Sequence, residues 1–343
     1  MKRKKAVIIF AVLSALVIGI LLVADSAGTA ETIKRCIYIC LDSLIPSLFC
    51  FMVFSSLLIK SGIGEILFTP LWYIMKFVLH LDRKMFGIFL LSQIGGYPVG
   101  VKLLSEFTDG SKECDKRCNT ALCYCYNSGP AFVIGIVGIG IYGDIKAGLI
   151  VFLSCLAANF TAAVIINIYS KPVNDSAVRF SLKAKDITAC ISGAAKALMN
   201  IALAILLFNT ATELADFVIG TLTGSELLYI IKAVTEITNI KNSGAVCSLP
   251  VVTALISFGG LCVIYQLYTL SAFRINMLRF IASRAVISAM AALICYIIVC
   301  ISGYSTAVNV FAYATDTLIS DPLLLLCIAG MTFILLQNTE RSN

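Results

Sequence analysis

The residues Asn127-Ser128-Gly129-Pro130 interrupt a stretch that is otherwise apolar enough to cross a bilayer. Asn and Ser side chains can cap free helical N–H groups, and Pro is favoured in a first turn, so a helix is expected to begin here. A helix start is the positive end of the helix dipole and attracts carboxylates or phosphates. Because unpaired backbone groups are costly in hydrocarbon, such a break needs protein or a water-filled cavity around it. The interruption therefore predicts a small-molecule site at Asn127, Ser128 and Gly129.

A second break is expected around Gly96 and Pro98. Glycine is conformationally permissive, proline lacks an N–H donor, and the residue before a proline is pushed out of the helical region. Gln93, Tyr97 and Lys102 lie nearby and offer polar groups to a ligand. The alternative is a simple kink that packs small residues against a neighbouring helix. Both interpretations bend the chain at Gly96.

A third candidate segment places Glu236 and Asn239 among hydroxyls and amides at the end of an apolar block. An ionisable residue at membrane depth is functional by default. If the block ends at Val234 instead, Glu236 is an ordinary loop residue. Both interpretations stay open from the sequence.

The fourth segment, Ser257-Phe258-Gly259-Gly260, lies inside a mainly apolar span. Ser257, Gly259 and Gly260 are candidate binding residues, although a Gly-Gly pair can equally serve close helix approach. Asn159 is a lone amide in another apolar span. Its alternative role is an interhelical hydrogen bond of roughly 0.6 kcal/mol.

Signatures of enzymes, metal sites and cofactor sites are weak in this chain. The single histidine, His80, stands beside Asp82 and Arg83 in an expected loop. The cysteine cluster Cys114, Cys118, Cys123 and Cys125 lacks the paired spacing of a zinc site. No phosphate-binding Gly-rich motif is present. We expect a protein that is not an enzyme, with no catalytic residues, no bound metal and no cofactor.

The composition identifies the setting in which these residues act. The 343 residues are 59% hydrophobic and 13% charged, with a mean hydropathy of +0.96, which excludes a soluble domain. The net charge of +7 comes from bases in short loops, where they set membrane orientation rather than recruit nucleic acid. Most of the 14 cysteines are scattered singly through apolar runs and imply no disulfide framework.

The chain begins with basic residues and an apolar run over 6–24, which predicts a first transmembrane helix with a cytoplasmic N-terminus. A signal peptide is the alternative. Five parts are expected: an N-terminal helix and loop (1–35), a first membrane repeat (36–170), a basic cytoplasmic loop (171–186), a second membrane repeat (187–303), and a C-terminal loop and helix (304–343).

Further apolar blocks are expected on both sides of the basic loop. Blocks 85–103 and 226–245 can be re-entrant instead of crossing, and a block at 187–209 precedes a short separate one at 213–223. The last two blocks are 285–302 and 322–337. If each block crosses once, the bases that precede 285–302, including Arg284, lie in a cytoplasmic loop.

The two sets of blocks begin on opposite sides of the membrane, so a repeat between them has inverted topology. Within it, 127–130 corresponds to 257–260. Chance similarity between strings of membrane helices is the alternative. The predicted fold is an all-α polytopic membrane protein with broken or re-entrant helices and inverted-topology repeats.

Five stretches carry a resemblance to a known family: Gly96-Tyr97-Pro98-Val99-Gly100-Val101-Lys102-Leu103, Asn127-Ser128-Gly129-Pro130-Ala131-Phe132, Ala158-Asn159-Phe160, Glu236-Ile237-Thr238 and Ser257-Phe258-Gly259-Gly260-Leu261. They resemble the YlbJ-like sporulation integral membrane proteins of the nucleoside-recognition, or Gate, domain group. The resemblance covers nearly the whole chain beyond the first helix. It implies a transporter that passes dipicolinic acid toward the developing spore, in the mother-cell-derived membrane around the forespore.

A planar dicarboxylate could be held by the N–H groups of 128–131, by Lys102, and by the amides of Gln93 and Asn239. The expected partners are therefore a small anionic substrate and the lipid bilayer, and not nucleic acid. One alternative is a nucleoside or nucleobase carrier that depends more on Glu236 and Asn239. Another is a membrane scaffold of the sporulation apparatus, in which the breaks merely pack helices.

Overall fold

The structure is a computed structural model that describes residues 19–20, 22–168, 180–219, 225–240 and 248–304. Every regular element in these residues is a helix, which confirms the all-α prediction. Up to residue 142 the elements are α2 (Ser26–Ile39), the π-helical η1 (Cys40–Leu44), α3 (Ile45–Ser61), α4 (Ile63–Leu79), α5 (Arg83–Gly95), α6 (Tyr97–Phe107), α7 (Lys112–Leu122), the π-helical η2 (Ala131–Ile139) and α8 (Gly140–Tyr142). Then follow α9 (Ile145–Asn167), α10 (Ala184–Ile219), α11 (Ser225–Thr235), the 3-10 helix η3 (Ile237–Asn239), α13 (Leu249–Phe258), α14 (Gly260–Leu270) and α15 (Met277–Ser302).

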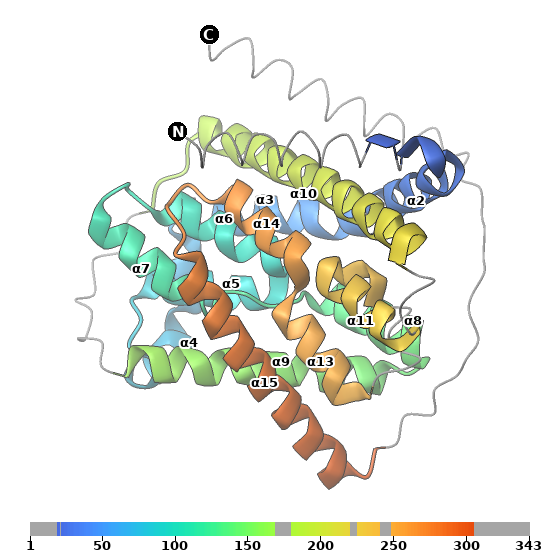
Figure 1. Cartoon of the computed structure of the whole chain (residues 1–343). Helices are drawn as coiled ribbons and strands as arrows, with labels where there is room; N and C mark the ends of the chain where they lie inside the picture. The colour runs from blue at the N-terminus through green and yellow to red at the C-terminus, as the bar shows by residue number, and fades with distance from the viewer. Residues whose placement is uncertain (1–18, 21, 169–179, 220–224, 241–247, 305–343) are drawn as a thin grey trace, which may run out of the picture.

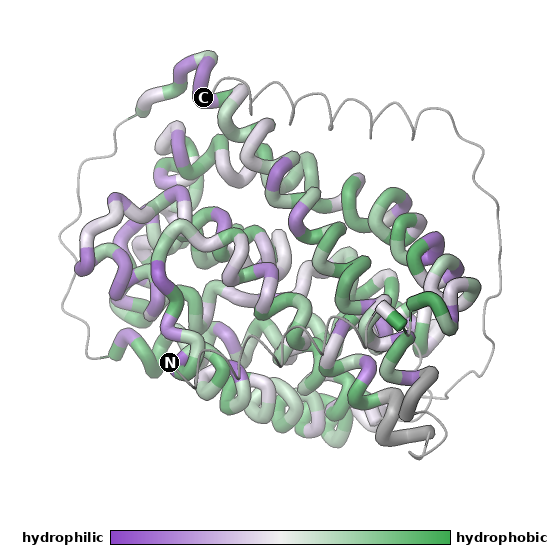
Figure 2. The backbone as a smooth tube through the Cα atoms, turned by 45° about the horizontal axis from the view of Figure 1, so that its top comes forward, coloured by the Kyte–Doolittle hydropathy of each residue, from purple (hydrophilic) through white to green (hydrophobic). Residues whose placement is uncertain are grey.

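Several described helices are long and apolar enough to cross a membrane. Four qualify on their own, and the count rises to five if one bent pair is taken as a single span. The four are Ile145–Asn167, Ala184–Asp216, Leu249–Leu270 and Met277–Ser302. The bent pair joins α2 and α3 at an angle of 46°. The chain is thus a polytopic membrane protein, and Figure 2 shows apolar residues along most of the helical tube.

The helices break where the sequence predicts breaks. The chain turns between α5 and α6 at Gly96, whose φ of +89° lies in the region that favours glycine. After α7 it runs without a helix through 123–129, and the next helical stretch begins at Pro130 and continues as η2. Between α13 and α14, Gly259 and Gly260 adopt φ values of +86° and +81°. Broken helices are therefore a confirmed feature of the fold.

One predicted boundary is wrong. The expected blocks 187–209 and 213–223 are joined in α10, a helix of 36 residues. The polar residues between the blocks bond back to their own helix: Asn209 Nδ2 donates to the Ile205 carbonyl at 3.0 Å, and Thr212 Oγ1 donates to the Asn209 carbonyl at 2.8 Å. Since this back-bonding satisfies the polar side chains inside a helix, they do not end it.

The broken helices are surrounded by longer ones. In the view of Figure 1, α15 runs diagonally across α9 and α13, and it packs against both. On the other side α10 packs against α2, α3 and α14. The segments 123–130 and 257–260 therefore lie inside the helical assembly.

Some predictions concern residues outside the described ranges. These are most of the first helix (6–24), the last span (322–337), most of the basic loop (171–186) and the polar residues 241–244. The inverted membrane orientation of the two repeats stays a prediction.

Candidate functional site

A cavity of about 260 Å³ lies where three of the breaks converge. Its walls come from α3, the α5–α6 break, the segment 128–132, α10, the α11–η3 break and α14. Apolar side chains such as Phe51, Phe132 and Val263 form much of the lining. Five of the predicted site residues also line it: Gly96, Tyr97, Ser128, Gly129 and Glu236.

The first two breaks touch through their backbones. A Cβ atom added to Gly96 would lie 3.1 Å from the amide nitrogen of Gly129. A Cβ atom added to Gly129 would lie 3.4 Å from the Ile94 carbonyl oxygen and 3.6 Å from the Gly96 Cα. Gly96 and Gly129, which are 33 positions apart in the sequence, thus lie side by side, as the predicted site requires.

Two helices begin at this contact and at the cavity wall. They are α6, which starts at Tyr97, and η2, which starts at Ala131. First-turn N–H groups have no acceptor within their own helix. In the described loops and caps, no backbone hydrogen bond is donated by Tyr97, Gly129 or Ala131. The cavity therefore faces the positive ends of two helix dipoles.

Glu236 lies in the break between α11 and η3 and is only 1% exposed. This burial argues against the alternative in which Glu236 is an ordinary loop residue. Its Oε1 atom accepts a hydrogen bond of 3.1 Å from the Thr238 N–H, whereas Oε2 has no partner among the described N–H and O–H groups. The Cys262 thiol of α14 lies beside the carboxyl. None of the ion pairs among the described residues includes Glu236.

Gln93 and Asn127 are buried but do not line the cavity. Gln93 Nε2 donates to the Tyr124 carbonyl at 2.9 Å, and Asn127 Nδ2 donates to the Gln93 carbonyl at 3.2 Å. Both amides thus satisfy carbonyls that the breaks leave without helical donors. They hold the first two breaks together and lie one layer behind the cavity wall.

Lys102 is also separate from the cavity lining. Its Nζ donates to Ser56 Oγ and, at 2.6 Å, to Glu106 Oε1. Lys60 Nζ lies 3.7 Å from the same carboxylate oxygen. Lys102 therefore belongs to a charge cluster toward the C-terminal end of α6, with Lys60 at its exposed edge, where the Glu106 carboxylate already balances Lys102.

Asn159 and Ser257 both accept hydrogen bonds from Arg284, a residue that the sequence predicts to lie in a loop. Arg284 was expected in a cytoplasmic loop, but α15 begins at Met277 and carries the arginine fully buried. Its Nη1 donates to Asn159 Oδ1 at 2.8 Å, and its Nη2 donates to Ser257 Oγ at 3.0 Å. The expectation is wrong because Asn276 caps an earlier helix start, accepting from the Arg279 N–H at 3.1 Å. Asn276, a residue type that commonly caps helices, was the sequence signal that could have predicted the earlier start of α15.

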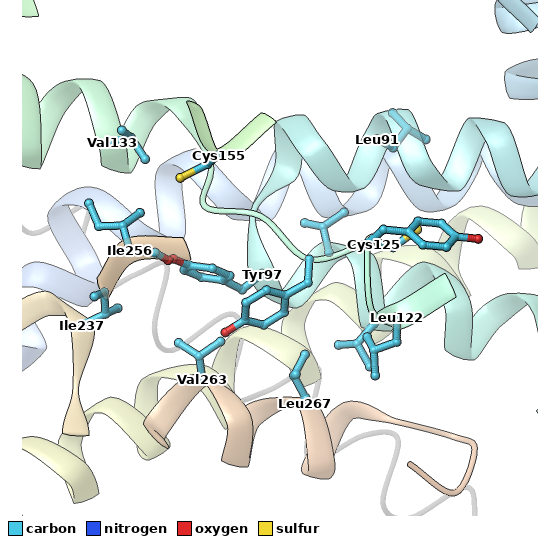
Figure 3. Packing of buried hydrophobic residues seen from close by; sticks show 14 of the residues in the cluster. Leu91, Tyr97, Leu122, Cys125, Val133, Cys155, Ile237, Ile256, Val263 and Leu267 are labelled. Atoms are coloured by element: carbon cyan, nitrogen blue, oxygen red, sulfur yellow. The ribbon is translucent and has the colours of Figure 1, made fainter. Parts of the chain in front are cut away.

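The end of α13 explains why polar side chains gather there. The last four carbonyls of a helix lack helical donors. Here each receives one: Leu255 from the Gly259 N–H, Ile256 from the Tyr97 hydroxyl, Ser257 from Arg284 Nη2, and Phe258 from the Tyr126 hydroxyl. Figure 3 shows the Tyr97 hydroxyl directed toward Ile256. Tyr97 therefore offers the cavity its ring, while its hydroxyl is engaged by the backbone.

The remaining predicted residues serve close packing or lie beside the cavity. Gly259 lies against the Tyr126 hydroxyl, and a Cβ added to Gly260 would be 3.0 Å from the Val234 carbonyl oxygen. This supports the helix-approach interpretation of the Gly-Gly pair. Asn239 is half-buried; its N–H donates to the Glu236 carbonyl at 3.0 Å, and its side chain is outside the lining.

Comparison of the chain with protein-family models, with curated proteins and with solved structures finds no match. In the described part of the chain, no three His, Cys, Asp or Glu side chains are grouped to hold a metal ion. The arrangement can bind a small solute by backbone N–H groups at one wall and by a carboxyl group at another. Its apolar lining suits a flat organic ring.

Proposed function

We propose that this protein is a membrane carrier of a small planar organic anion, which binds in the cavity between α6 and η2. The observation that carries the proposal is the contact of two helix breaks, Gly96 against Gly129, with both helix N-termini at one cavity wall. Discontinuous helices whose N-termini point at a substrate carboxylate are a recurrent device of secondary transporters. Dipicolinate, the substrate that the YlbJ resemblance implies, has this chemistry. The forespore membrane is its proposed location.

The cavity suits such a solute in size and in chemistry. A volume of about 260 Å³ lies near the lower end of the range for small-molecule pockets. Phe51, Phe132 and Tyr97 can contact an aromatic ring, and the N–H groups of 129 and 131 can bind a carboxylate. The site needs no buried cation, because helix dipoles supply the positive potential.

A nucleoside or nucleobase is the second candidate substrate, and two specific observations favour it. Glu236 lines the cavity and could accept hydrogen bonds from a base or a ribose. Lys102, the cation expected to favour an anion, is outside the lining and paired with Glu106.

Uptake of radiolabelled dipicolinate and uridine into proteoliposomes containing the full chain tests the proposal. We expect dipicolinate uptake, and we expect Ala131→Trp to abolish it by filling the cavity mouth beside the η2 N-terminus. Val286→Trp is the matched control, because Val286 is 68% exposed on the outer side of α15. Uptake of uridine alone would select the second candidate, and no flux of either solute would favour the scaffold.

A further inference from the structure

We propose that Glu236 is the proton-binding site of the carrier and that one proton enters the cavity with each substrate anion. The inference rests on the proposed anion carrier and specifies how that carrier is coupled to an energy source. The observation behind it is a buried carboxyl group, at the wall of the same cavity, with one oxygen left without a partner.

The geometry fixes which oxygen is available. The Thr238 N–H engages Oε1 at 3.1 Å and so orients the carboxyl group at the break. Oε2 accepts no hydrogen bond from an N–H or O–H group of the described residues, and the Cys262 thiol beside the carboxyl is only a weak donor. A proton on Oε2 would make this atom a hydrogen-bond donor, and a bound carboxylate can accept that hydrogen bond.

When an anion is bound in the cavity, electrostatics favours the protonated form of Glu236 over the ionised form. Two negative charges within one small cavity lined mainly by apolar side chains repel, because the surrounding protein screens them less than bulk water does. The helix N-termini attract the anion but leave Glu236 without a counter-ion, since no Lys or Arg of the described ranges pairs with it. Binding of the proton removes the repulsion and adds a donor. The anion and the proton therefore stabilise each other in the cavity.

The groups that face Glu236 do not provide another source of positive charge. They are the thiols of Cys36 on α2, Cys40 on η1 and Cys262 on α14. Tyr97 on α6 lines the same cavity, but its hydroxyl donates to the Ile256 carbonyl. On α11, the helix that precedes Glu236, Lys232 Nζ is held by Asp216 of α10 at 2.6 Å. A divalent metal ion would need several side-chain ligands, and the described residues present no group of three or more His, Cys, Asp or Glu side chains. A single carboxyl group with a free oxygen is sufficient to take a proton.

Proteoliposomes with an entrapped pH-sensitive dye test the inference on the full chain. Dipicolinate added outside should acidify the lumen. Because a dicarboxylate that enters with one proton still carries one net negative charge, the membrane potential is clamped at zero with potassium and valinomycin, and an inward gradient of one pH unit should then support about tenfold accumulation. Glu236→Gln keeps the shape but cannot ionise. We expect this variant to exchange internal for external dipicolinate while losing both lumen acidification and acid-driven accumulation. Glu213→Gln, a change of the same kind on α10 outside the cavity lining, should behave as wild type.

The outcomes separate the two proposals. Substrate-linked proton entry that persists in Glu236→Gln would overturn the role of Glu236 and leave the carrier intact. Dipicolinate exchange by the wild type without any proton entry would overturn proton coupling, and with it the role of Glu236, but not the anion carrier. If the wild type, purified as a monodisperse protein, exchanges no dipicolinate, the anion carrier itself is wrong and the proton proposal falls with it.

Discussion

Arg284 donates a 2.8 Å hydrogen bond from Nη1 to the side-chain oxygen of Asn159, and both residues are fully buried. The same guanidinium reaches the Cys123 carbonyl at 3.1 Å and the Ser257 carbonyl at 2.6 Å. These carbonyls lie at the C-terminal ends of α7 and α13, which are the negative ends of two helix dipoles. The Tyr126 ring lies 4.6 Å from the guanidinium carbon. Arg284 thus joins the two breaks that the sequence paired as counterparts.

Replacement of Arg284 by lysine should destabilise the protein. Lysine keeps the charge but lacks the planar fork that reaches several acceptors at once, so buried carbonyls lose their donors. We expect a loss of roughly 1–3 kcal/mol for an unsatisfied buried group. Thermal unfolding in detergent, followed by the fluorescence of Trp72, measures it. Arg279→Lys is the control, since Arg279 is exposed one turn or so earlier on α15. Equal melting temperatures for the two variants would contradict the expectation.

Gly96→Ala should impair both stability and transport. Its φ of +89° strains any residue with a Cβ, and that atom would press on the Gly129 amide at 3.1 Å. Backbone strain of this kind costs roughly 1–3 kcal/mol. Gly135→Ala is the matched control, because a Cβ at Gly135 meets nothing within 4 Å. A Gly96→Ala protein that melts and transports like Gly135→Ala would show that the two breaks are not in contact.

Lys102→Met should lower stability more than it changes substrate affinity. The lysine balances Glu106 at 2.6 Å outside the cavity lining, so its loss leaves a half-balanced carboxylate, at a cost of roughly 1–3 kcal/mol. The double variant Lys102→Met, Glu106→Gln should recover part of that loss. Melting temperatures and the KM for uptake separate the two effects. A raised KM at unchanged stability would instead place Lys102 at the substrate.

The contact between Asp144 and Tyr304 should make stability depend on pH. The Tyr304 hydroxyl donates to Asp144 Oδ2 at 2.6 Å and, with the Lys146 N–H, lowers the pKa of that carboxyl below its ordinary value of 3.8. A lowered pKa stabilises the folded state above the ordinary value, and this contribution is lost as the pH falls through the folded-state value. Burial and the same contact raise the pKa of Tyr304 from its ordinary value of 10 to about 12, so its contribution is fully present below pH 10 and is lost as the pH rises from 10 through about 12.

Tyr304→Phe tests this dependence by removing the hydroxyl alone. Its melting temperature should fall below that of the wild type near neutral pH. The difference should shrink in strong acid, where Asp144 is protonated. A difference that stays constant from neutral to acid would mean that the hydrogen bond does not act through the carboxylate.

The sequence by itself determined where the chain bends. Gly96, the segment 127–130 and the pair Gly259-Gly260 mark breaks because glycine permits left-handed backbone and proline lacks a donor. These effects act between neighbouring residues and are readable locally. The all-α membrane class follows in the same way from the length and hydropathy of the apolar runs.

Only the tertiary structure decided which polar groups face the cavity and which are consumed by partners. Lys102 is balanced by a residue four positions away, but Arg284 is held by Cys123, Asn159 and Ser257, which lie 161, 125 and 27 residues from it along the chain. Glu236 remains without such a partner and so stays available to a ligand. The fate of a buried charge depends on donors and acceptors that distant helices bring to it, and the sequence around the charge does not contain them.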